Sequence, residues 1–155
     1  MKHLFILTFI ALLFGSCKKS ADNMPDDNFD CVKSGGELKS RAALEFQIVG
    51  IWKLVKISAM IPNPPVPNVS ITFTSASQVQ ISKDDKLIYN GKYEWTEIVT
   101  PNETIYLLDI KSWNYQTLGD NYIRGSIRMC NTQLMVDDGM AADGPGYFFV
   151  KIGNI

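Results

Sequence analysis

The sequence predicts an all-β fold of about eight short antiparallel strands, arranged as an up-and-down barrel or, alternatively, as a β-sandwich. Apolar and polar residues alternate with a period of two along most of the chain after residue 47, as in strands with one buried face. The segments between these runs are rich in glycine, proline, asparagine and aspartate, the residues that favour tight turns. A chain of 155 residues with this pattern fits one such domain.

Composition divides the chain into four regions, which are residues 1–16, 17–30, 31–46 and 47–155. The first region holds the basic Lys2, an almost entirely apolar run over 4–14 and then Gly15-Ser16, an order typical of a secretory signal peptide. A spanning helix needs about 20 apolar residues, so this run is too short to be a membrane anchor.

The next two regions lead from the signal to the predicted barrel. Residues 17–30 are polar and include four aspartates, which indicates a flexible tether with little to bury. Residues 31–46 form a lead-in segment in which Ser34-Gly35-Gly36 marks a turn and 38–46 predicts a short helix.

The tetrapeptide Phe14-Gly15-Ser16-Cys17 resembles the lipobox of bacterial lipoproteins. The resemblance implies that Cys17 carries fatty acyl chains such as palmitate and becomes the first residue after cleavage, whereas the alternative is an ordinary secreted protein. Several acyl chains together give a stable membrane anchor. Lys18 stands where an aspartate would retain such a lipoprotein at the inner membrane, so the resemblance implies the outer membrane, facing either the periplasm or the cell surface.

The composition disfavours catalysis and nucleic-acid binding. The one histidine of the chain, His3, lies in the predicted signal, which removes triads and proton shuttles that use histidine and most zinc chemistry. Catalysis by paired carboxylates stays formally open, but the acidic residues form no motif. Cleavage of residues 1–16 takes only Lys2 from the 15 lysines and arginines and leaves all 16 acidic residues, so no basic footprint for nucleic acid remains. We therefore expect a non-enzyme without metal or cofactor.

Two cysteines remain besides Cys17. In an oxidising compartment Cys31 and Cys130 predict one disulfide that ties the lead-in segment to a late strand. The alternative is a pair of buried thiols that behave as small apolar side chains.

The alternation predicts eight strands, at 48–57, 69–74, 78–82, 92–96, 104–111, 122–129, 132–137 and 147–152. In the last of these strands we expect Phe148, Val150 and Ile152 to face inward.

Gly50-Ile51-Trp52, near the start of the first predicted strand, resembles the Gly-x-Trp opening of lipocalin-like families, especially the small lipocalin-like domains of bacterial lipoproteins. The resemblance covers residues 47–155 and implies an eight-stranded up-and-down barrel. In such barrels Gly50 would allow close packing at the closed end, and Trp52 would plug that end. Lipocalins also tend to place a late arginine against this tryptophan, and after Arg128 only Lys151 can take that place.

Two functions follow from this reading. The barrel scaffold would bind a protein or glycan partner through its loops, with the aromatic residues Trp113 and Tyr115 as candidate contacts beside the proline-rich stretch 61–68 and the connection 137–146. Alternatively, the barrel interior would carry a small apolar ligand. The candidate ligand contacts are Trp52, Phe73, Tyr93, Trp95 and Phe148. Large side chains can also simply fill so narrow a barrel.

Overall fold

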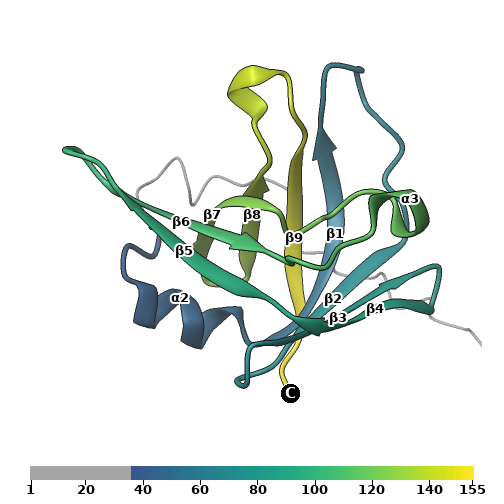
Figure 1. Cartoon of the computed structure of the whole chain (residues 1–155), viewed down its shortest axis with the longest axis horizontal. Coiled ribbons are helices and arrows are strands. Elements are labelled where there is room, and N and C mark those ends of the chain that lie inside the picture. The colour runs from purple at the N-terminus through teal and green to yellow at the C-terminus, as the bar shows by residue number, and fades with distance from the viewer. Residues whose placement is uncertain (1–35) are drawn as a thin grey trace, which may run out of the picture.

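A computed structural model describes residues 36–155, which form one nine-stranded antiparallel sheet curled into a half-barrel (Figure 1). The predicted signal peptide, the tether, Cys17 and Cys31 lie outside the described residues. The strands are β1 (Gly50–Ser58), β2 (Val69–Phe73), β3 (Gln78–Lys83), β4 (Lys86–Lys92), β5 (Glu94–Val99), β6 (Thr104–Asp109), β7 (Gly125–Cys130), β8 (Gln133–Asp137) and β9 (Gly146–Gly153). The helices are α2 (Arg41–Ile48), α3 (Tyr115–Leu118) and the 3₁₀ turn η1 (Met140–Ala142).

The strand order is β4-β3-β2-β1-β9-β8-β7-β6-β5, so the first and last strands meet at the centre and the two middle strands of the sequence form the edges. Side chains on one face of this sheet pack into a single apolar group, the core cluster, which includes Trp52, Leu54, Ile71, Phe73 and Phe149. The predicted all-β class is confirmed, while the predicted closed, eight-stranded barrel is not.

The ninth strand is β4, which the alternation did not reveal. Its residues have no clean apolar–polar pattern because several of its side chains are exposed or half-buried, as at Leu87 and Tyr89. A two-residue turn at Asp84 and Asp85, with φ of 51° and 61°, folds β4 back onto β3. Two positive φ values of this kind match the twist of a β-hairpin. The chemistry of the turn therefore predicts this strand better than its hydrophobic pattern does.

The sheet stays open because β4 and β5 do not pair along their lengths. One residue, Tyr93, separates them, and β5 continues away from the end of β4 instead of folding back beside it (Figure 1). The segment 110–124 fills the open side, with Ile110, Trp113 and Ile123 in the core cluster. The start of the strand predicted at 122–129 belongs to this plug, since β7 begins at Gly125.

Helix α2 covers one end of the half-barrel, two to three residues later in the sequence than the predicted 38–46. Ser40 caps its start by accepting a hydrogen bond from the Ala43 amide at 3.3 Å. Leu44 and Ile48 turn into the core cluster and are almost fully buried. The helix therefore belongs to the folded domain and closes the end at which β1 begins.

Trp52 and Lys151 join this helix to the sheet. The Trp52 ring is fully buried, and its Nε1 donates to the Ile48 carbonyl at 2.6 Å. Lys151 Nζ donates to the Gln47 carbonyl at 2.9 Å and lies 5.5 Å from the Trp52 ring centroid. Both donors satisfy carbonyls at a helix C-terminus, where a cation is also favoured. Lys151, the only basic residue after Arg128 in the sequence, thus lies against the tryptophan.

Gly50 lets the chain pass closely under this junction. Its φ is 137°, and a Cβ at this position would lie 2.5 Å from Lys151 Cε and 2.7 Å from the Gly153 carbonyl oxygen. A larger residue would be strained and would push Lys151 away from the tryptophan.

We expect Lys151→Met to lower the free energy of unfolding by about 1–2 kcal/mol, because it removes a charge-assisted hydrogen bond and a cation–π contact in a partly buried place. Urea denaturation of both proteins measures the difference. Lys92→Met, at the exposed end of β4, is the matched control and should change stability by less than about 0.5 kcal/mol. Equal losses in the two variants would contradict the role assigned to Lys151.

Candidate functional site

The side chains expected to line a ligand cavity mostly fill the interior themselves. Trp52 and Phe73 are fully buried and Tyr93 is 5% exposed, all within the core cluster. The Phe73 and Tyr93 rings meet edge to face with centroids 5.2 Å apart, and the Tyr93 and Trp95 centroids lie 6.2 Å apart. Trp95 is half-buried against the same cluster. Phe73, Tyr93 and Trp95 therefore form a packed aromatic group, and Trp52 belongs to the same core cluster.

Phe148 does not join that group, and the inward face predicted for β9 is wrong by one residue. Tyr147 and Phe149 lie in the core cluster, whereas Phe148 is half-buried on the opposite face with Lys56 Nζ 5.7 Å from its ring. Apolar residues occupy both faces of β9, so its alternation could not distinguish inside from outside.

Trp113 and Tyr115, the aromatic pair predicted for partner contact, have different surroundings. Trp113 is only 7% exposed; its ring packs on Tyr89 at 5.4 Å, and its Nε1 donates to the Gly119 carbonyl at 2.8 Å. It is therefore a core residue of the plug, and the prediction that it lies on the surface is wrong. Tyr115 is 49% exposed and remains a surface residue.

Three connections lie at the same end of the half-barrel, and we call this end of the molecule the loop end. The connections are residues 59–68, 110–124 and 138–145. The register places Ser58 beside Gly146, Gly146 beside Asp137, and Asp137 beside Ser126, so these connections leave neighbouring strands together. Helix α2 covers the opposite end (Figure 1).

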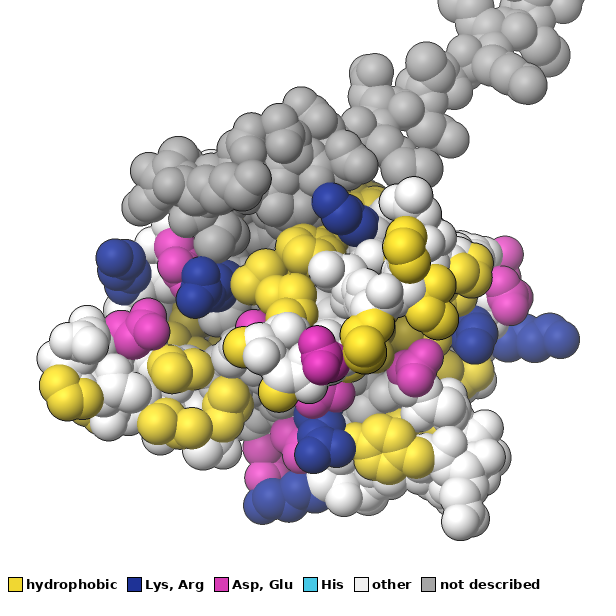
Figure 2. Space-filling view, turned by 90° about the horizontal axis from the view of Figure 1, so that it is seen from above, with side chains coloured by type: hydrophobic (Ala, Val, Ile, Leu, Met, Phe, Trp, Pro, Cys, Tyr) yellow, Lys and Arg dark blue, Asp and Glu magenta, His cyan; other side chains and the backbone are white. Residues whose placement is uncertain are grey.

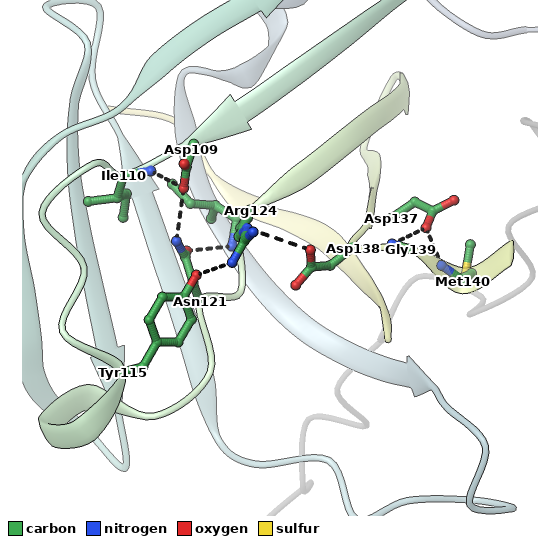
Figure 3. A network of polar contacts seen from close by, with 10 residues as sticks. Asp109, Ile110, Tyr115, Asn121, Arg124, Asp137, Asp138, Gly139 and Met140 are labelled. Atoms are coloured by element: carbon green, nitrogen blue, oxygen red, sulfur yellow. Dashed lines mark hydrogen bonds and ion pairs between the residues drawn. The ribbon is translucent and has the colours of Figure 1, made fainter. Parts of the chain in front are cut away.

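A buried amide holds the plug in place at the loop end (Figure 3). Asn121, at 3% exposed, is the buried polar side chain within residues 36–155. Its Nδ2 donates to Asp109 Oδ1 at 3.2 Å, and its Oδ1 accepts from the Ile123 amide at 3.3 Å. Asp109 Oδ1 also accepts from the Ile110 amide at 2.7 Å. These bonds tie the two ends of the plug together where the chain leaves β6 and enters β7.

Arg124 connects the plug to the next loop. Its guanidinium donates to the Tyr115 hydroxyl at 2.8 Å and lies 3.8 Å from Asp138 Oδ1 (Figure 3). Partial burial, together with the nearby Asp109 and Asp137, raises the pKa of Asp138, whereas Arg124 opposes this shift. Asp137 itself accepts from two amides of the 139–140 turn. The loop end is thus held together by hydrogen bonds and an ion pair, and its surface carries charges of both signs.

We expect Asn121→Ala to destabilise the domain by about 1–3 kcal/mol, because the buried Ile123 amide then loses its acceptor. Thermal unfolding followed by circular dichroism should show a lower midpoint. Asn102→Ala, in the exposed turn between β5 and β6, is the control and should leave the midpoint within error. An unchanged midpoint in the Asn121 variant would mean that the plug is held by apolar packing alone.

The proline-rich loop presents exposed apolar side chains beside a groove. Met60 is 74% exposed, Ile61 69% and Val66 43%. The groove has a volume of about 460 Å³ and runs between this loop and the end of β1. The loop is fixed at its far end, where Asn68 accepts from Lys53 and its carbonyl accepts from the Asp84 amide at 2.9 Å. Figure 2 looks onto this end of the molecule and shows hydrophobic side chains at its surface among charged ones.

A second cleft, of about 370 Å³, lies between the lead-in segment, β6 and β7. The two strands pair only at Leu107 and Leu108 of β6, so they diverge beyond that point. Leu38 enters the divergence, and its amide donates to the Met129 carbonyl at 2.8 Å. This cleft is a gap that the lead-in segment partly fills.

Sequence reasoning missed the exposed Met60 and the bracing role of Asn121. The Gly119-Asp120-Asn121 run signals a turn in the sequence, but it does not show that the last of these amides is buried. Within residues 36–155, no group of three or more His, Cys, Asp or Glu side chains is placed to hold a metal ion. No helix in that part of the chain is long and apolar enough to span a membrane.

Comparison with known proteins gives no match, either to a family model or to a curated protein or solved structure.

Proposed function

We propose that this chain is a non-catalytic, lipid-anchored protein of the bacterial cell envelope whose half-barrel presents its loop end to a protein partner. The observation that carries the proposal is the exposed apolar trio Met60, Ile61 and Val66 beside a groove on a loop that is anchored at one end. Prolines at four positions between 62 and 67 restrict this loop, so ordering it on binding costs little conformational entropy.

A protein partner fits these side chains better than a glycan does. Sugar rings stack on exposed aromatic faces, but Trp113 is buried in the plug, the exposed Tyr115 ring has Arg124 over it at 5.9 Å, and the trio has no aromatic residue. Exposed Ile and Met side chains at a groove, with Tyr115 and Arg124 elsewhere on the loop end, have the apolar centre and mixed polar rim of protein interfaces.

A small apolar ligand inside the half-barrel is less favoured. Trp52, Phe73 and Tyr93 are all buried in the core cluster, with the Phe73 and Tyr93 rings edge to face, and a ligand would have to displace them. Of the residues that line the two clefts described above, only Ile127 belongs to that cluster, so both clefts lie at its margin or beyond it.

Kinship with lipocalin-like domains is part of the same proposal. It is supported by a curled antiparallel sheet, by Gly50 under the junction and by a basic side chain, Lys151, against Trp52.

The partner surface is testable by site-specific photo-crosslinking in the producing cells. We expect a photoreactive residue at position 61 to give a discrete adduct, and one at position 87 to give none. Leu87 is the matched control because it is an apolar residue of β4 with 57% exposure. After identification of the adduct, Ile61→Asp should weaken the purified complex by at least about tenfold in Kd, whereas Leu87→Asp should not.

Both substitutions are on the surface, so stability should change by less than about 0.5 kcal/mol in each. Adducts at both positions, or equal losses of affinity, would exclude the proline-rich loop as the partner surface. A small molecule that co-purifies in native mass spectrometry would favour the interior instead.

Lipid anchoring is tested separately. We expect cells grown with an alkyne-bearing fatty acid to label the full-length protein and to retain it in the outer-membrane fraction. Cys17→Ser should abolish the label and release the protein from that fraction, while Cys130→Ser should remain labelled. Labelling that persists in Cys17→Ser would contradict lipid anchoring at Cys17. It would not bear on the partner surface proposed for the loop end.

A further inference from the structure

The outward face of the half-barrel has buried side chains that the core cluster does not explain. Cys130 and Val150 are 1% exposed and Met135 is 8% exposed, yet none of them belongs to the core cluster. They lie close together in the sheet, because Cys130 pairs with Gln133 and Gln133 pairs with Val150, while Met135 pairs with Phe148.

The register places these side chains on the face away from the core. Successive residues of a strand point to opposite faces, and Leu134 and Val136 of β8 lie in the core cluster. Met135 between them therefore points outward, as does Cys130 next to the inward Met129. An uncovered antiparallel face leaves its side chains in water, so this burial requires a cover.

The described helices do not provide that cover. Leu44 and Ile48 of α2 and Leu118 of α3 all pack against the core cluster on the other face, and η1 has no buried residue. The covering group must come from the chain before residue 36 or from another molecule.

The start of the described chain indicates which of these it is. Leu38 is hydrogen-bonded to Met129, the neighbour of Cys130, and Glu37 lies 4.0 Å from Arg128. The chain before Gly36 therefore begins beside the covered face. From Leu38 back to Cys31 an extended chain reaches at most about 25 Å, which is ample for the short return to Cys130.

The residues just upstream have the matching chemistry. From the end of the tether into the lead-in segment the sequence reads Phe29-Asp30-Cys31-Val32-Lys33, which holds the three apolar side chains of residues 26 to 36. Gly35-Gly36 allows the chain to reverse direction after them.

We propose that residues 29–34 lie over the outward face of β7, β8 and β9 as a cover, with Phe29 against Met135 and Val150 and with a disulfide between Cys31 and Cys130. The two thiols give up two protons and two electrons to a disulfide-bearing oxidant, which is reduced to its dithiol as the new S–S bond forms. The cover fixes the exit of the tether at this face, so only residues 18–28 remain to separate the domain from an anchor at Cys17. This inference does not depend on the proposed partner.

Methionine oxidation of the full-length protein tests the cover, because the chain has its own internal standards. Under a hydrogen peroxide pulse read by peptide mass spectrometry, the exposed Met60 should oxidise quickly, while Met135 and the core residue Met129 should be slow. Phe29→Asp should raise the oxidation rate of Met135 by about tenfold or more and leave the oxidation of Met129 slow. Phe46→Asp, at an 82% exposed position of α2, is the matched control and should change neither rate.

A slow Met135 in Phe29→Asp, with Met129 also slow, would overturn the proposal. So would Met135 protection that is lost from the wild-type chain on purification, since a partner would then be the cover. If the oxidation of Met129 also becomes fast, the variant has lost its folded core and does not test the cover. The non-reduced peptide map of the wild-type protein then tests the proposal. A Cys31–Cys130 linked peptide supports the cover, and a Cys130 that is alkylated without reduction or linked elsewhere overturns it.

Discussion

The junction of Trp52 with α2 and Lys151 is the constraint on which the rest of the structure depends. It brings together the helix before the sheet, the first strand and the last strand, three parts of the chain that are far apart in sequence. The buried indole of Trp52 and the ammonium group of Lys151 both donate hydrogen bonds to carbonyls at the end of α2 that would otherwise be unsatisfied. Because α2 closes this end, the sheet can curl around the indole. Its two edge strands, β4 and β5, then diverge on the open side of the half-barrel.

That divergence explains why the domain has a plug. A sheet that does not close leaves apolar residues facing water, and the chain fills the opening with its own connection between β6 and β7. Trp113 supplies the bulk and Asn121 the polar attachment. Because the interior is filled in this way, the exposed apolar groups suited to recognition lie on the loops. These loops are carried by a sheet with a fully packed core.

The sequence predicts those features that depend on regular alternation or on a short motif. The strand class follows from the alternation, whereas the close packing at Gly50 is implied by the resemblance of Gly50-Ile51-Trp52 to a lipocalin-like opening, which also leaves Lys151 as the one basic residue able to lie against the tryptophan. The sequence does not predict β4, where exposure on both faces removes the alternation, or the inward face of β9, where Phe148 and Phe149 are equally apolar. Trp113 was misplaced because an aromatic residue among turn formers looks the same in sequence whether it plugs a core or faces water.

The central pairing of β1 with β9 also sets the order in which the domain can form. Hairpins such as β2–β3 and β7–β8 join neighbouring segments and can form early, but the ladder between them needs β9, which follows all the other strands in sequence. A growing chain therefore cannot complete this sheet until β9 has been made. Until then the hairpins on either side of β1 and β9 remain separate, and the pairing of β9 joins them into one folded domain.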